Sequence, residues 1–99
     1  GKFIEEAHTR LRESSTERVE RRIAHLVLRL TRQAGHSIDG GVEISFPITR
    51  QDIALMMGAT LHTVSRVLSA WEQDGIVDGG RQHLVLRDPQ ALARIAEEA

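Results

Sequence analysis

The strongest constraint on the fold lies in Arg50–Leu68, where two short helical patterns are separated by a single glycine. Helices joined by so short a connection cross closely, and Ala54 provides a small residue for the point of contact. Gly58 stands where the chain must turn sharply, and glycine adopts positive φ without strain. The segment therefore predicts a helix-turn-helix, with helices over about Arg50–Met57 and about 61–74.

Threonines mark the start of both predicted helices. Thr49 and Asp52 have the spacing of a capping box, and Thr60 is a suitable N-cap for the second helix. The second helix also carries an apolar stripe with steps of three and four residues, formed by Val64, Val67, Leu68 and Trp71. This periodicity predicts that one face of the second helix is buried against the first.

The opposite face of the second helix is short or polar, and consists of His62, Ser65, Arg66 and Ser69. Arg66 lies one turn from the helix start, the end with which a recognition helix contacts base edges in the major groove. The same end offers free N–H groups to phosphate. This face indicates nucleic-acid binding, and the alternative for Arg66 is an ordinary surface arginine.

The N-terminal third of the chain predicts two helices. Residues 1–12 carry apolar residues at helical spacing, and Ser14 with Glu17 has capping-box spacing for a second helix. The second helix is expected to end at Gly35. We expect residues 1–13 to be the end of a longer helix, with a frayed terminus as the alternative, and 14–99 to form the domain itself.

The remaining segments predict a small amount of strand. Residues 36–41 predict a loop, 42–46 alternate as a strand does, and 76–86 predict a hairpin that turns at 78–80. A last helix should begin at Pro89, after an aspartate N-cap. The expected fold class is α+β, mainly helical, with a helix-turn-helix, a small antiparallel sheet and a hairpin.

Composition narrows the range of functions. The 99 residues fit one small domain, and the absence of cysteine excludes disulfides, thiolate zinc sites and a cysteine nucleophile. The apolar runs are far shorter than the ~20 residues of a membrane helix. Residues 37–99 hold five arginines and nine acidic residues, a net charge of −4. Nucleic-acid binding must therefore be argued from the motif, because few cations are available for phosphates.

Motifs of catalysis and metal binding are missing from the sequence. The five histidines show no HExxH spacing, and there is no GxxxxGK[ST], GxGxxG or GxSxG. No set of nucleophile, base and orienting residue is suggested. We expect no enzyme, no metal and no cofactor in this segment.

The segment Ile48–Val77 resembles the C-terminal DNA-binding domain of the Crp/Fnr transcription factors. The likeness rests on the TRQDIA opening, the HTVSR core and the hairpin that follows, and it extends over most of Ser15–Ala99. It implies a winged helix-turn-helix over residues 14–99, with a wing hairpin, and it implies that residues 1–13 are the end of the dimerisation helix or a linker. It also implies a cytoplasmic bacterial regulator that acts as a homodimer on palindromic promoter DNA, with no membrane and with RNA polymerase as a possible partner. Family members bind their effector in an N-terminal sensor, which is absent from this sequence.

The resemblance also implies roles for individual residues. Phosphate contacts are expected from Thr49, Arg50, Gln51, Thr60 and, in the wing, Arg81. Base contacts are expected from Leu61, His62, Ser65 and Arg66, and Arg66 occupies the position that contacts guanine.

Two positions depart from the family pattern. Many members have glutamate where this chain has His62, and one large subgroup has arginine where it has Leu61. A glutamate at the position of His62 would accept a hydrogen bond from cytosine N4. At its own position, Leu61 offers only an apolar contact, for instance to a thymine methyl. The DNA half-site that the family usually recognises should therefore not be assigned to this chain. The HTVSR variant resembles the branch that responds to nitrogen oxides.

A second interpretation is a winged helix that docks another protein and binds no DNA. It is supported by the acidic C-terminal half, and fold alone does not decide function. Binding to random duplex DNA at low salt distinguishes the two interpretations.

Overall fold

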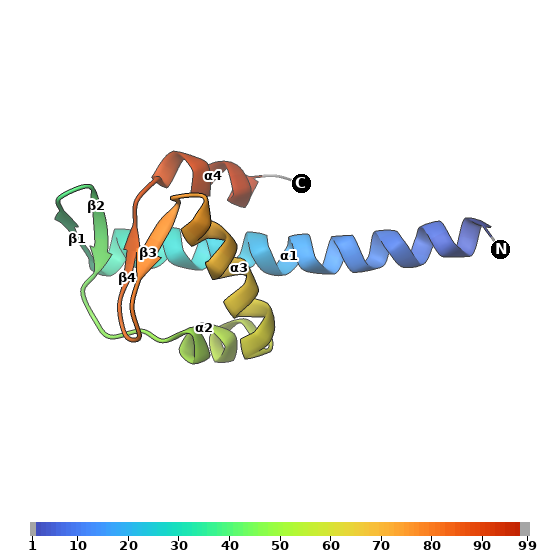
Figure 1. Cartoon of the computed structure of the whole chain (residues 1–99), viewed down its shortest axis with the longest axis horizontal. Helices are drawn as coiled ribbons and strands as arrows, with labels where there is room; N and C mark the ends of the chain where they lie inside the picture. Colours follow the sequence, from blue (N-terminus) through green and yellow to red (C-terminus); the bar gives the residue numbers. More distant parts are fainter. Residues whose placement is uncertain (1, 98–99) are drawn as a thin grey trace.

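The computed structural model describes the backbone of residues 2–97 and the side chains of residues 17–97. Within these residues the elements follow one another as α1, β1, β2, α2, α3, β3, β4 and α4 (Figure 1). The helices are α1 (Lys2–Ala34), α2 (Arg50–Met57), α3 (Leu61–Gln73) and α4 (Pro89–Glu97). The strands are β1 (Gly35–Ile38), β2 (Gly41–Ile44), β3 (Val77–Gly79) and β4 (Leu84–Leu86). The predicted α+β class is confirmed.

Helix α1 is a single helix from Lys2 to Ala34, so the predicted helix start at Ser14 is wrong. No glycine or proline interrupts the segment. Serine and threonine lower helix propensity only by about 0.5 kcal/mol each, which is too little to end a helix between good helix formers. The predicted dimerisation role of residues 1–13 depends on side chains that lie outside the described ones.

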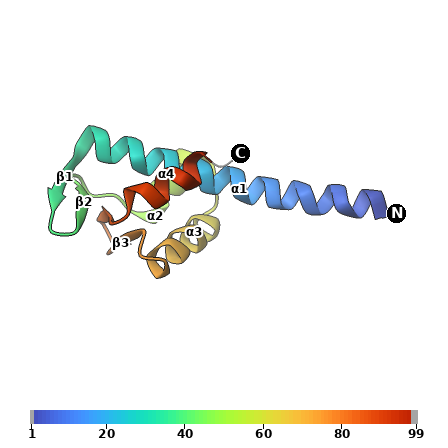
Figure 2. The same cartoon turned by 90° about the horizontal axis from the view of Figure 1, so that it is seen from above.

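The C-terminal half of α1 carries one side of the core. Ile23, Ala24, Leu26 and Val27 are all buried. Helix α4 packs beside this stretch and buries Leu92 and Ala96 (Figure 2). The Asp88 carboxylate accepts a hydrogen bond from the amide of Ala91 at 3.1 Å, which confirms the predicted N-cap of α4.

The four strands form one antiparallel sheet in the order β1-β2-β4-β3. Strand β1 was expected as loop, and that expectation is wrong: Gly35 pairs with Ile44 and Ile38 pairs with Gly41. Strand β1 is largely exposed, so it has no apolar alternation that sequence could reveal. Phe46, expected at the end of a strand, lies beyond β2 and is exposed.

Helix α1 ends just before Gly35, as predicted. The reason for a glycine at this position, however, is not a left-handed helix cap. Its φ is not positive, and a Cβ there would lie 2.3 Å from the carbonyl oxygen of Thr31. A glycine is therefore required by the close approach of β1 to the last turn of α1.

The wing hairpin of β3 and β4 turns later than predicted. Asp78 pairs with Val85 and Gly79 with Leu84, so the turn lies at 80–83 instead of 78–80. The aspartate accepts the amide hydrogen bond of Gly79 at 2.8 Å while remaining in the strand. This position of the turn places Arg81 at the tip of the wing.

Candidate nucleic-acid interface

Helices α2 and α3 begin at the predicted caps. The Oγ1 atom of Thr49 accepts from the Asp52 amide at 3.0 Å, and the Asp52 carboxylate accepts from the Thr49 amide at 2.9 Å. The capping box is therefore complete. At the start of α3, Oγ1 of Thr60 accepts from the amide of Thr63 at 3.2 Å. Both caps satisfy N–H groups that would otherwise have no partner in the helix.

The turn between α2 and α3 is three residues long and depends on Gly58. Its φ of 64° and ψ of 32° lie in the left-handed region, as predicted. The Ala59 amide donates to the Ala54 carbonyl at 3.0 Å, the closing bond of a Schellman motif. Ala54 is only 2% exposed at the crossing. Such a short turn with glycine joins the two helices of a helix-turn-helix.

The two helices bend by 118° relative to each other. This angle lies within the range of about 90–120° that helix-turn-helix motifs show.

Among the described helices none is by itself long and apolar enough to cross a membrane; α2 and α3 meet that criterion only when taken together across their bend.

Helix α3 has the two faces that its sequence predicts. The predicted stripe of Val64, Val67, Leu68 and Trp71 is buried in the core. On the other face His62, Arg66 and Ser69 are exposed, Ser65 is half-buried, and Leu61 at the helix start is 46% exposed. The four predicted base-contacting residues therefore lie together on the accessible side of the first turns of α3.

The predicted phosphate-contacting residues gather along one edge of the domain. Gln51 and Thr60 are exposed and Thr49 is half-buried, at the two helix starts. The wing turn reaches the same edge, beside the start of α2 (Figure 1). The Ile48 amide donates to the Gln82 carbonyl at 3.0 Å, so the wing turn is tied to the cap of α2. Arg81, the neighbour of Gln82, is exposed at this edge.

Arg50 is bonded within the protein. Its guanidinium donates to the Ser65 carbonyl at 3.2 Å, to the Ser69 hydroxyl at 3.0 Å and to the Glu72 carboxylate at 2.8 Å. All three partners are on α3. Glu72 was not among the predicted site residues, because no short motif links it to a residue 22 positions earlier.

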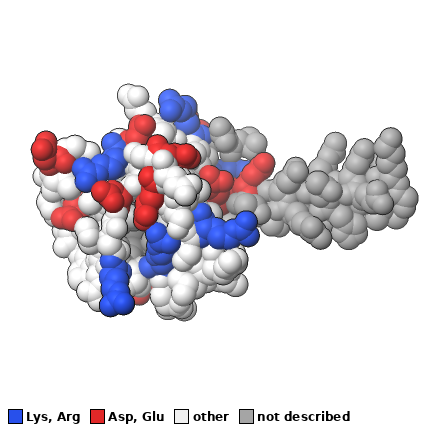
Figure 3. All heavy atoms as spheres, in the orientation of Figure 1, with Lys and Arg blue, Asp and Glu red and all other residues white. Residues whose placement is uncertain are grey.

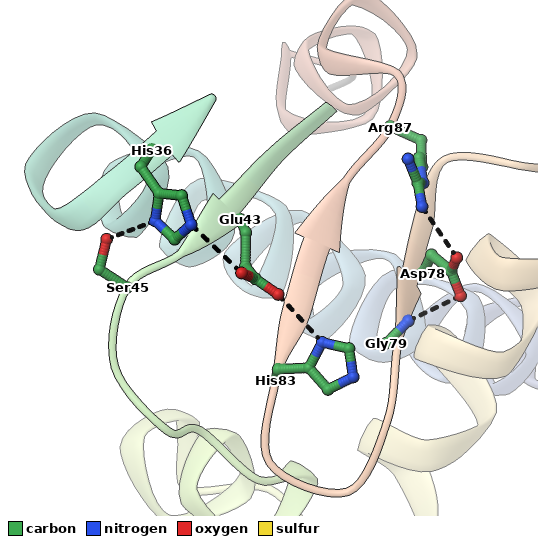
Figure 4. A network of polar contacts seen from close by, with 7 residues as sticks. All are labelled: His36, Glu43, Ser45, Asp78, Gly79, His83 and Arg87. Atoms are coloured by element: carbon green, nitrogen blue, oxygen red, sulfur yellow. Dashed lines mark hydrogen bonds and ion pairs between the residues drawn. The ribbon is translucent and has the colours of Figure 1, made fainter. Parts of the chain in front are cut away.

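A polar network braces the sheet and the wing (Figure 4). The Glu43 carboxylate lies between two imidazoles, 3.2 Å from Nε2 of His36 and 3.2 Å from Nδ1 of His83. Nδ1 of His36 lies 2.8 Å from the Ser45 hydroxyl. Sequence reasoning missed this cluster, since its members come from β1, β2 and the wing. It joins the outer hairpin of the sheet to the wing.

A second part of the network holds the base of the wing. Arg87 donates to the Asp78 carboxylate at 3.2 Å and to the Asp39 carbonyl at 3.0 Å. The hydrogen bond from Arg87, followed by that from the Gly79 amide, keeps the pKa of Asp78 below its ordinary value. A lowered carboxylate pKa means that this contribution to stability is present above the ordinary titration range of aspartate and is lost as the pH falls through the lowered value.

The surface charge is mixed. Figure 3, which has the orientation of Figure 1, shows arginines interspersed with acidic residues over the described part of the surface in view, without a continuous basic area. Among the residues whose side chains are described, no group of three histidine, aspartate or glutamate residues can hold a metal ion. The candidate interface consists of the polar face of α3, the starts of α2 and α3, and the wing turn.

These elements define a winged helix-turn-helix domain. The sequence model of one protein family, described as the Crp-like helix-turn-helix domain, matches residues 21–95. The chain therefore belongs to this family, as the resemblance predicted.

Similar proteins include transcriptional regulators. The transcriptional activator protein FnrL of Cereibacter sphaeroides is 39% identical over 62 residues, which are 62% of this chain and 24% of that protein. The nitrogen fixation regulation protein FixK of Azorhizobium caulinodans is 35% identical over 78 residues, covering 77% of this chain and 32% of that protein. This chain spans about a quarter to a third of these two relatives.

Solved structures show the same fold. The CO-dependent transcription factor CooA of Carboxydothermus hydrogenoformans superposes with a TM-score of 0.75 at 26% identity, over 79% of this chain and 36% of that one. A CRP/FNR-family transcriptional regulator of Thermus thermophilus has a TM-score of 0.74 at 26% identity, over 96% of this chain and 48% of that one.

Proposed function

We propose that this domain is the sequence-specific DNA-binding output of a Crp/Fnr-type transcription regulator, bound as part of a dimer to palindromic promoter sites. Helix α3 enters the major groove with its first turns against the bases. Leu61, His62, Ser65 and Arg66 contact base edges, and Thr49, Gln51, Thr60 and Arg81 contact phosphates. Arg50 belongs to the same phosphate group by resemblance, but its guanidinium already has partners on α3.

The observation that carries this proposal is the exposed polar face at the start of α3. His62 and Arg66 are exposed there, while the opposite stripe is buried. The starts of α2 and α3 and the wing turn lie along one edge, so all three can face the phosphates of one bound duplex. Helix N-termini favour phosphate through their free N–H groups and partial positive charge.

The charge of the domain predicts modest affinity for DNA. Residues 37–99 carry a net charge of −4, from five arginines and nine acidic residues. The salt slope scales with the number of phosphates neutralised, at about −0.9 per phosphate on duplex DNA. With few cations at the interface, we expect a shallow slope and a large share of uncharged contacts.

The test is anisotropy of a labelled random-sequence duplex titrated with the chain at low and at moderate salt. Binding that weakens as salt rises supports the proposal. No binding even at low salt contradicts it and favours a winged helix that docks another protein, as the net negative charge of residues 37–99 would suit. A random pool enriched on the protein then yields the preferred half-site.

Arg66→Ala should weaken binding to the preferred site by about 1–3 kcal/mol and relax the preference at one guanine per half-site. The guanidinium can donate two hydrogen bonds to guanine O6 and N7, which alanine cannot replace. Competition binding against a panel of single-base variants measures both effects. Arg94→Ala on α4 removes the same charge from an exposed position away from α3 and is the matched control. An Arg66→Ala protein with wild-type preference at every base contradicts the assigned contact.

His62→Glu should move the preferred base toward cytosine, with a change in discrimination of about 1–3 kcal/mol. The carboxylate accepts from cytosine N4, whereas an imidazole also serves as a donor. Gln73→Glu, at the other end of α3, adds the same charge and should leave the preferred sequence unchanged. Selection from a random pool with both variants measures the outcome. If the two variants select identical sites, His62 does not contact a base.

A further inference from the structure

Arg50 spans nearly two turns of the recognition helix. From the first position of α2, its Nη1 donates to the Ser65 carbonyl and to the Ser69 hydroxyl, and its Nη2 donates to Glu72 Oε1 at 2.8 Å. These acceptors are four and three residues apart, so they lie along one side of α3. The side chain of Arg50 therefore bonds to one backbone carbonyl and to two side chains of α3, the second of them in the last turn of the helix.

The wing lies beside this contact. A cavity of about 20 Å³ is lined by Arg50, Glu72 and Leu68 together with Gly79, Gly80 and His83 of the wing. The side chains of Arg50 and Glu72 are 35% and 36% exposed. A half-exposed pair is screened less than a fully exposed one, and the planar fork of arginine suits several acceptors in fixed directions.

We propose that Arg50 is a positioning residue for base readout, acting through Glu72 and the backbone of Ser65. It holds the rotation and crossing of α3 against α2, so that Arg66, the neighbour of Ser65, meets the bases in one orientation. Contacts to base edges need placement to within about 0.5 Å, and that placement depends on supporting side chains. The inference rests on the proposed DNA binding and replaces the expected phosphate contact of Arg50.

The two roles of Arg50 predict opposite results for Glu72→Gln. If Arg50 contacts phosphate, the loss of the carboxylate removes the charged partner of the guanidinium and one negative charge, so that all DNA binds more tightly. If Arg50 positions α3, the same substitution weakens binding to the preferred sequence and leaves random-sequence binding nearly unchanged. Loss of a phosphate contact would also lower the salt slope by about 1, whereas loss of a positioning contact would not.

The experiment compares Arg50→Lys, Glu72→Gln and the double variant in the full chain. The probes are a duplex selected by the wild type from a random pool and a random-sequence duplex, each titrated at several salt concentrations. We expect each single variant to lower the ratio of selected to random affinity by roughly 3- to 30-fold, with the double variant no worse than either, because the residues act as one unit. Arg81→Gln should instead weaken both duplexes equally and lower the salt slope.

The outcomes separate this inference from the proposed function. Thermal unfolding of each variant, followed by circular dichroism, restricts the comparison to folded proteins. Amide chemical shifts of Ser65 and Ser69 in Arg50→Lys report the disturbed contact without DNA, and unchanged shifts overturn the inference. An unchanged affinity ratio, or tighter binding of both duplexes by Glu72→Gln, overturns it too while DNA binding stands. A wild type that binds neither duplex contradicts both.

Discussion

Fusing a parallel two-stranded coiled coil to the N-terminal end of α1 should raise the affinity for a palindromic operator by about 10²- to 10⁴-fold. The gain arises because binding of the first half-site turns the second binding event into an intramolecular one. Half-sites for such dimers lie one helical turn apart, so both recognition helices must be held at that spacing. The chain alone should bind DNA weakly and remain monomeric at micromolar concentration.

The reason for expecting a monomer is the small apolar content of the first turns. Phe3, Ile4, Ala7 and Leu11 are the apolar residues of positions 1–12. Specific interfaces bury about 1,200–2,000 Å² in total, which is more than so few side chains supply. Sedimentation of the chain and of the fusion measures the oligomeric state.

The control for the fusion is the same coiled coil with charged residues at its core positions, which adds the same mass without dimerising. A second control moves the two half-sites apart by half a helical turn, which should abolish the gain for the dimeric fusion. A chain that is already a tight dimer, or a fusion that binds no better than its control, contradicts this account of α1.

Trp71→Ala should destabilise the domain by about 3–5 kcal/mol. Trp71 is 2% exposed and is the largest fully buried side chain, and it belongs to one core cluster with residues of α1, α2 and the sheet. Its loss leaves a cavity that the surrounding aliphatic residues fill only in part. Because a domain of this size is stable by only about 5–15 kcal/mol, much of the protein should unfold under mild denaturant.

A second substitution at the same position separates packing from hydrogen bonding. The Trp71 indole donates to the Glu20 carboxylate at 3.2 Å, so Trp71→Phe keeps most of the packing and loses this bond between α3 and α1. We expect Trp71→Phe to cost far less than Trp71→Ala. Urea unfolding followed by far-ultraviolet circular dichroism suits all variants, since it does not depend on tryptophan fluorescence.

Leu55→Ala is the matched control for core substitution. Leu55 lies on α2 and is 72% exposed, so its truncation should change stability by no more than about 0.5 kcal/mol. If Trp71→Ala unfolds at the same urea concentration as Leu55→Ala, the assignment of Trp71 as a core anchor is wrong.

Features that depend on neighbours in the chain were predicted to the residue. The Thr49–Asp52 capping box and the left-handed Gly58 involve atoms only a few positions apart, so sequence spacing determines their geometry. Helix α2 begins and ends as expected for the same reason. The two faces of α3 follow from helical periodicity, which places His62 and Arg66 opposite the buried stripe.

Features that depend on a partner strand were predicted poorly. Strand β1 has little apolar pattern and is held by its pairing with β2, and the wing turn shifted because Asp78 and Gly79 pair with β4. The capping-box spacing at Ser14 occurs within a continuous helix, because nothing nearby breaks α1. Capping-box spacing therefore predicts a helix start only where the residues before it do not themselves continue a helix.

The residues alone were enough to predict the helix-turn-helix, its caps and the polar face of α3, because these follow from short-range hydrogen bonding and helical periodicity. Two contacts became visible only in the folded chain: Arg50 faces Glu72, 22 residues away, and Glu43 lies between His36 and His83. Such contacts form between elements whose relative placement depends on the packing of the whole core. A charged residue that sequence alone assigns to a ligand can therefore be bonded within the protein once the fold brings a carboxylate beside it.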